Sequence, residues 1–143
     1  MTLFMETTKI DPSQTVGEIQ KVLGRYGAKS IQVEYEDGEV SGVAFIVEVS
    51  GKRIPFKLPC RWKAVHSMLV GRMHRIRNQE EYVLQAKRIA WRQILRWVQA
   101  QLALVETDMV RIEEVFMPYL VVDQGKTLYE KLAHNGFLLE APK

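Results

Sequence analysis

The chain is poor in cysteine: Cys60 is the only one among 143 residues. A single cysteine excludes an intrachain disulfide and is typical of a reducing compartment. The three histidines, His66, His74 and His134, lack the spacing of metal ligands, so we expect no metal site. Cys60 is either a nucleophile paired with His66 or an inert small residue, and the second interpretation is favoured.

Long hydrophobic runs are also absent. No stretch reaches eighteen apolar residues, and the opening "MTLFMETTKI" lacks the basic start and apolar run of a signal peptide. We therefore expect neither a signal peptide nor a membrane span, and we expect a cytoplasmic protein.

Catalytic motifs are missing as well. The chain contains no Gly-x-x-x-x-Gly-Lys-Ser/Thr phosphate loop, no Gly-x-Gly-x-x-Gly and no His-Glu-x-x-His. Glu113 and Glu114 are adjacent, so they point to different sides of their predicted helix and do not form a catalytic pair. The sequence therefore predicts a non-enzymatic protein with no catalytic residue and no cofactor.

The first 59 residues predict one helix followed by strands. "DPSQTVGEIQKVLGRYG" has a cap at Asp11 or Ser13, Pro12 in its first turn and Gly27 at its end. Its apolar stripe consists of Val16, Ile19 and Leu23.

Three alternating segments then predict an antiparallel meander with one buried face: "SIQVEYE", "VAFIVEV" and "IPFKL". Pro55 places the last of these strands at an edge, and residues 4–10 predict a further short edge strand. The residues expected on the buried face are Ile31, Val33, Tyr35, Val43, Phe45, Val47, Val49, Ile54, Phe56 and Leu58.

After Pro59 the apolar period becomes helical. The first predicted helix begins at Arg61 and breaks near Gly71, and the second, long helix runs over about 78–106. A short third helix is stopped by Pro118, and the last runs from about Lys126 to Asn135-Gly136. The fold class is α+β: a meander of three or four strands packed on a helical C-terminal half with one long helix. We expect a single domain over 1–143, with the N-terminal helix and meander in 1–59 and the helical half in 60–143.

Charge is unevenly distributed along the chain. Residues 52–96 hold twelve Lys/Arg and two acids, which gives +10, whereas residues 1–51 carry −4 and residues 97–143 carry −3. A basic middle between acidic ends indicates either an anionic partner or internal pairing of the middle with the ends.

Three arginines repeat every fourth residue along the long helix: Arg88, Arg92 and Arg96. At 100° per residue the apolar side chains fill an arc of about 180°, and the three arginines share the opposite polar stripe. This stripe is a phosphate-binding face, a face that is solvated or paired with acids elsewhere in the chain, or a contact with a protein partner. The candidate acids are Glu34, Glu36, Asp37, Glu39, Glu113 and Glu114.

The wide apolar arc itself predicts burial against several elements and, if these do not cover it, a homo-oligomer. Lys87 projects into this arc, so it is either a cation whose stem snorkels along the core edge or a buried cation at a pocket or subunit interface.

The segment before the long helix, "GRMHRIRNQ" (71–79), reads as a basic loop. Together with the helix it predicts one phosphate-binding surface of Arg72, Arg75, Arg77, Arg88, Arg92 and Arg96. Trp62 and Tyr82 are the candidates for stacking on bases, because Trp91 and Trp97 lie in the apolar arc.

Two segments, residues 7–28 and 85–132, resemble an uncharacterised family of small proteins from bacterial prophages and other mobile elements. The matching positions are Trp91, Arg92, Ala100, Phe116, Pro118, Tyr119 and Thr127. The resemblance implies an accessory protein that serves replication, recombination, packaging, regulation or defence against host immunity in a bacterial cytoplasm. It carries over no catalytic or binding residue.

The leading hypothesis is a non-enzymatic phage or prophage accessory protein whose arginines bind nucleic acid or the phosphates of a nucleotide. One alternative is an oligomeric counter-defence protein that sequesters a host factor or a nucleotide signal. A second alternative is a structural, self-assembling phage protein.

Overall fold

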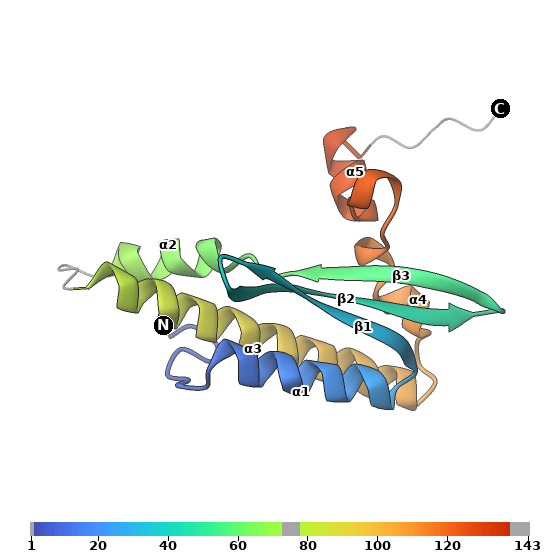
Figure 1. Cartoon of the computed structure of the whole chain (residues 1–143), viewed down its shortest axis with the longest axis horizontal. Coiled ribbons are helices and arrows are strands. Elements are labelled where there is room, and N and C mark those ends of the chain that lie inside the picture. The colour runs from blue at the N-terminus through green and yellow to red at the C-terminus, as the bar shows by residue number, and fades with distance from the viewer. Residues whose placement is uncertain (1, 73–77, 138–143) are drawn as a thin grey trace.

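The computed structural model describes residues 2–72 and 78–137. In this part an antiparallel sheet and a set of helices follow one another as shown in Figure 1. The elements are α1 (Pro12–Arg25), β1 (Ala28–Glu36), β2 (Glu39–Val49), β3 (Lys52–Pro59), α2 (Trp62–Arg72), α3 (Gln79–Glu106), α4 (Ile112–Val115), the 3-10 turns η1 (Met117–Tyr119) and η2 (Asp123–Gly125), and α5 (Leu128–His134). The α+β prediction and the long helix are confirmed.

Helix α1 begins and ends where its sequence signals lie. Asp11 is the N-cap and accepts a hydrogen bond from the Ser13 amide at 2.9 Å, while Pro12 occupies the first turn. Beyond the helix, Gly27 has φ 107°, a conformation that glycine adopts without steric cost. The predicted stripe of Val16, Ile19 and Leu23 is buried.

The strands are ordered β1-β2-β3, so β3 is an edge strand, as Pro55 indicates. In the register, Phe45 lies opposite Ile31 on one side and Phe56 on the other, and Val43 lies opposite Val33 and Leu58. The buried apolar side chains of β2 and β3 are Val43, Phe45, Val47, Phe56 and Leu58, which confirms the predicted inward face at these positions.

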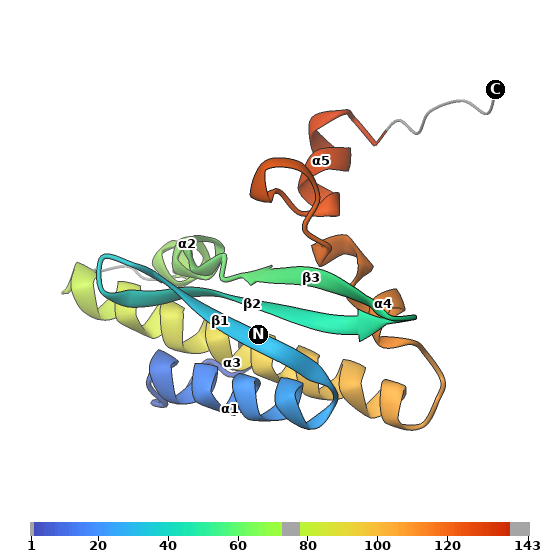
Figure 2. The same cartoon turned by 45° about the vertical axis from the view of Figure 1, so that its right-hand side comes forward.

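Both views in Figures 1 and 2 place α1 and α3 side by side on one face of the sheet. Between these layers the rings of Phe45, Phe56 and Phe116 meet, with centroids 5.2 Å apart for Phe45 and Phe116 and 5.4 Å apart for Phe45 and Phe56. Trp97 of α3 packs on Phe116 at 5.5 Å. Both halves of the chain therefore contribute to one hydrophobic core.

Two strand predictions were wrong. Residues 4–10 form turns, with Glu6 donating to the Leu3 carbonyl at 3.0 Å, and they lie along α3. The Gln85 amide donates to the carbonyls of Glu6 and Thr8 at 3.0 and 2.8 Å. Since glutamine side chains of α3 satisfy this backbone, the segment needs no neighbouring strand.

Tyr35 is the second error: it is 66% exposed instead of buried. The pairing of β1 with β2 shifts between Glu34 and Tyr35, so that Glu34 lies opposite Gly42 and Tyr35 opposite Val40. A bulge of this kind breaks the alternation of side chains.

The last part of the chain passes the edge of β3 and ends in α5. Leu120 forms a bridge with Phe56, and the Val121 amide donates to the Pro55 carbonyl at 2.9 Å. Thr127 and Glu130 form a capping box that starts α5, which ends at Asn135. In both views α5 stands apart from α1 and α3, and its main contacts are with η1. The short helix predicted before Pro118 is α4, which ends at Val115, and Pro118 itself lies inside η1.

The aromatic centre of the core should dominate stability. We expect Phe45→Ala to lower the free energy of unfolding by about 3–5 kcal/mol, because the side chain is buried between two other rings. Urea denaturation followed by circular dichroism measures this, with Tyr35→Ala on the same sheet as the exposed control. Equal losses in the two variants would contradict the assignment of the buried face.

Candidate ligand-binding site

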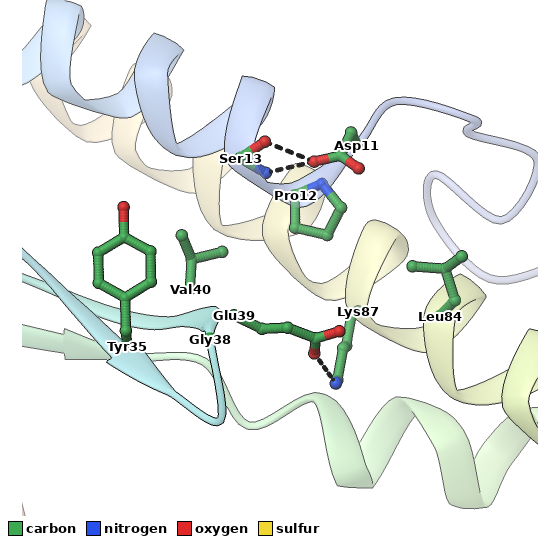
Figure 3. A pocket seen from close by; sticks show the side chains of 9 residues that line it. All are labelled: Asp11, Pro12, Ser13, Tyr35, Gly38, Glu39, Val40, Leu84 and Lys87. Carbon is green, nitrogen blue, oxygen red and sulfur yellow. Dashed lines mark hydrogen bonds and ion pairs between the residues drawn. The ribbon is translucent and has the colours of Figure 1, made fainter.

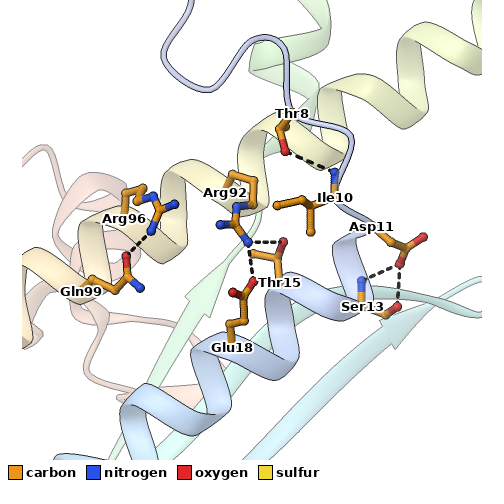
Figure 4. A network of polar contacts seen from close by, with 9 residues as sticks. All are labelled: Thr8, Ile10, Asp11, Ser13, Thr15, Glu18, Arg92, Arg96 and Gln99. Carbon is orange, nitrogen blue, oxygen red and sulfur yellow. Dashed lines mark hydrogen bonds and ion pairs between the residues drawn. The ribbon is translucent and has the colours of Figure 1, made fainter.

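The arginine stripe of α3 is not an open surface. Arg92 is 4% exposed and lies between α3 and α1, where its guanidinium pairs with Glu18 and donates to the Thr15 hydroxyl at 3.4 Å (Figure 4). Its Nε is buried and has no hydrogen-bond partner in the described part of the chain. Arg92 therefore joins two helices and is not available to a ligand in this conformation.

The flanking arginines differ from Arg92. Arg88 is half-buried, and it donates to the Gln85 side-chain oxygen at 3.2 Å. Arg96 is exposed and donates to the Gln99 side-chain oxygen at 2.8 Å. Neither guanidinium has an ion pair with a carboxylate of residues 2–72 and 78–137.

The predicted basic loop falls mostly outside the described residues, and this includes Arg75 and Arg77. Arg72 is the last residue of α2, where it forms an ion pair with Glu6 at 2.6 Å. Whether the six predicted arginines form one surface stays a prediction, but two of them, Arg72 and Arg92, are engaged by acids of the N-terminal quarter of the chain.

The arginine stripe is thus partly paired within the chain, but its acidic partner is not one of the six acids that the sequence suggested. Arg92 pairs with Glu18 of α1, whereas the acids of the meander pair with other cations. Glu34 lies 3.5 Å from Lys57, and Glu39 pairs with Lys87. In the sequence, Glu18 could be predicted as a partner only from its position next to Ile19 in the buried stripe of α1.

The side chain of Lys87 snorkels, so that its stem lies along the apolar arc of α3 while its Nζ reaches polar partners at the edge. Its side chain is 20% exposed, and its Nζ pairs with Glu39 and lies 4.8 Å from the ring centroid of Trp62. Trp62, one of the predicted stacking residues, is therefore half-buried beneath a cation of its own chain. Tyr82, the other, is half-buried and lines a hollow of about 540 Å³ beside the N-terminal segment.

A pocket of about 190 Å³ lies between the start of α1, the β1–β2 hairpin and α3 (Figure 3). Its charged groups are occupied: Lys87 pairs with Glu39, and Asp11 accepts hydrogen bonds from Ser13. These Ser13 bonds lower the pKa of Asp11, and the positive charge of Arg88 contributes in the same direction. A pocket whose polar groups satisfy one another offers little to a ligand.

A second hollow, which we call the α2–α3 groove, is chemically different. Its volume is about 360 Å³, and it is lined by Pro59, Arg61, Ala64, Val65, Ala90, Gln93, Ile94, Trp97 and Tyr119. Arg61 is exposed and has no carboxylate partner in the described residues, and its guanidinium lies 5.7 Å from the Tyr129 ring centroid. The groove thus combines an unpaired cation with an apolar, aromatic wall, and sequence reasoning missed it because its residues come from separate elements.

Cys60 lacks the properties of a nucleophile. Burial raises the pKa of its thiol to about 12, which the nearby charge of Lys87 only partly opposes. Within residues 2–72 and 78–137, no group of three or more His, Cys, Asp and Glu side chains is placed to hold a metal ion. No helix among the described residues has the length and apolarity needed to cross a membrane.

Comparison with known proteins identifies no relative: no family model, no curated protein and no solved structure matches the chain.

Removing the guanidinium of Arg92 should destabilise the protein. We expect Arg92→Ala to cost about 1–3 kcal/mol, because it removes a buried side chain that binds Glu18 and Thr15 across the contact between α1 and α3. Arg96→Ala, one turn further along and exposed, should change stability by no more than about 0.5 kcal/mol. Thermal or urea unfolding of both variants gives the comparison, and similar stability for the two would show that Arg92 is not a structural ion-pair residue.

The thiol of Cys60 should react slowly in the folded protein. At pH 8 a pKa of about 12, compared with an ordinary 9.0, makes the reactive thiolate about a thousandfold rarer, so alkylation should slow accordingly. Iodoacetamide labelling followed by mass spectrometry, with the urea-unfolded chain as reference, measures the ratio. Comparable rates in the two states would refute the assignment of Cys60 as an inert residue.

Proposed function

We propose that the protein is a non-enzymatic binding protein that engages the phosphates of a nucleic acid or nucleotide. One observation carries the proposal: six of the ten described basic residues in 52–96 have no ion pair with an acid of the described chain. These six are Lys52, Arg53, Arg61, Lys63, Arg88 and Arg96. Cations without an ion pair are available to phosphates without first breaking an internal salt bridge.

The cations with the most suitable surroundings lie at the start of α2. Arg61 and Lys63 flank Trp62, and we call these three residues the basic turn. Both cations are exposed, and Arg61 also borders the α2–α3 groove. Cations beside aromatic side chains are the combination that binds nucleic acid strands with little sequence selectivity.

The resemblance to mobile-element proteins supports the role of a phage or prophage accessory protein in a bacterial cytoplasm. A homo-oligomer stays a prediction. The argument for it from an uncovered apolar arc is weaker, because α1, α2 and the sheet all pack against α3 and bury residues on several of its sides. Sequestration of a host factor or nucleotide signal, and self-assembly, therefore have no separate structural support.

The test is a salt-dependent binding titration of an Arg61→Ala/Lys63→Ala variant. We expect weaker binding of a fluorescent single-stranded oligonucleotide, and a salt slope lower by about 0.7 for each phosphate contact that is lost. The control is Lys52→Ala/Arg53→Ala, which removes the same charge from the exposed β2–β3 hairpin. This variant should weaken binding clearly less than the Arg61→Ala/Lys63→Ala variant does.

Equal weakening in the two double variants would show a diffuse charge effect without a site at α2. A third variant, Arg61→Lys, separates an electrostatic track from a fixed geometry. Lysine keeps the charge but lacks the planar fork of arginine, so retained binding supports a track and lost binding supports a bidentate phosphate contact.

A further inference from the structure

We infer that the α2–α3 groove holds one unpaired nucleobase while Arg61 contacts the phosphate attached to it. This inference rests on the proposed function and makes it more specific. It predicts that the protein prefers single strands or free nucleotides to duplexes, because a paired base is stacked inside its helix and does not reach a groove.

The dimensions and walls of the groove suit a single flat ring. Its volume of about 360 Å³ lies at the small end of ligand sites. Two of its lining side chains are the rings of Trp97 and Tyr119, with centroids 5.5 Å apart and planes inclined at 65°. Both rings are half-buried, so the core holds them in place while part of their surface stays accessible. These rings, together with the apolar side chains of Ala90 and Ile94 in the same lining, stabilise any base by stacking and burial.

The polar side chains that line the groove, Arg61 and Gln93, suit the phosphate and the polar edge of the base. Arg61 is unpaired there, and its contact with Tyr129 orients a guanidinium that presents several N–H donors to phosphate oxygens. The Gln93 amide nitrogen donates to the Phe4 carbonyl at 2.9 Å, which fixes the side chain and leaves its oxygen as an acceptor for a base amino group. In contrast, the pocket of Figure 3 has its lysine and carboxylates already paired.

The experiment compares two labelled strands of equal length and charge: an oligothymidylate and an abasic deoxyribose-phosphate strand. Wild type should bind the strand with bases on the order of tenfold more tightly, because stacking is lost in the abasic strand. Ala64→Trp places a large side chain in the groove and keeps every cation. It should abolish the preference while affinity for the abasic strand stays unchanged.

Ser67→Trp is the matched control, since Ser67 is exposed on the same helix and does not line the groove. It should keep the full preference. Tyr119→Leu removes one aromatic wall and serves as a second variant should Ala64→Trp unfold, which circular dichroism reports. Competition with thymidine monophosphate distinguishes the source of the base: displacement of the strand by the mononucleotide identifies a nucleotide site, and displacement only by strands identifies nucleic acid.

Equal wild-type affinity for the two strands would overturn the base site while leaving phosphate binding in place. Equal affinity for a duplex and a single strand of the same sequence would overturn it as well. Failure to bind either strand, together with failure to bind thymidine monophosphate, would overturn the proposed function itself.

Discussion

The fold depends on the burial of α3. This helix of 28 residues carries buried side chains on several of its sides, which requires more than one covering element. The sheet covers one side through Phe45 and Phe56, α1 and α2 pack on others, and the turns of residues 4–10 are held along the helix by Gln85 and Gln93. The α2–α3 groove lies where side chains of α2, α3 and η1 come together, and the basic turn lies at the start of α2.

Local rules predicted most of the secondary structure. The cap at Asp11, the alternation along β2 and β3 and the edge position of Pro55 each depend on neighbouring residues alone, and each agrees with the structure. Tyr35 could not be predicted, because a bulge depends on how two strands pair and not on the alternation within one. Residues 4–10 resemble a strand in composition, but hydrogen bonds from a helix some 80 residues later decide their conformation.

The candidate site illustrates a different limit. A helical wheel assigns Arg92 to the polar side of α3 and predicts an exposed side chain. In the structure that side packs against α1, where Arg92 is buried and pairs with Glu18. A count of charges along the chain cannot distinguish a paired cation from a free one. The net +10 of residues 52–96 therefore identified a region rich in cations. It overstated the number of cations that a ligand can bind, because several of them form ion pairs within the chain.

The segment that crosses the outer edge of β3 has a consequence for the sheet as a whole. Leu120 forms a bridge with Phe56 and the Val121 amide binds the Pro55 carbonyl, so the β3 edge of the sheet is partly closed by its own chain, while β1 forms the other edge. A strand that added at β3 would have to displace this crossing segment, whereas a strand that added at β1 would not. Strand addition between copies of this protein is therefore less favourable at β3 than at β1, which works against growth of the sheet in both directions.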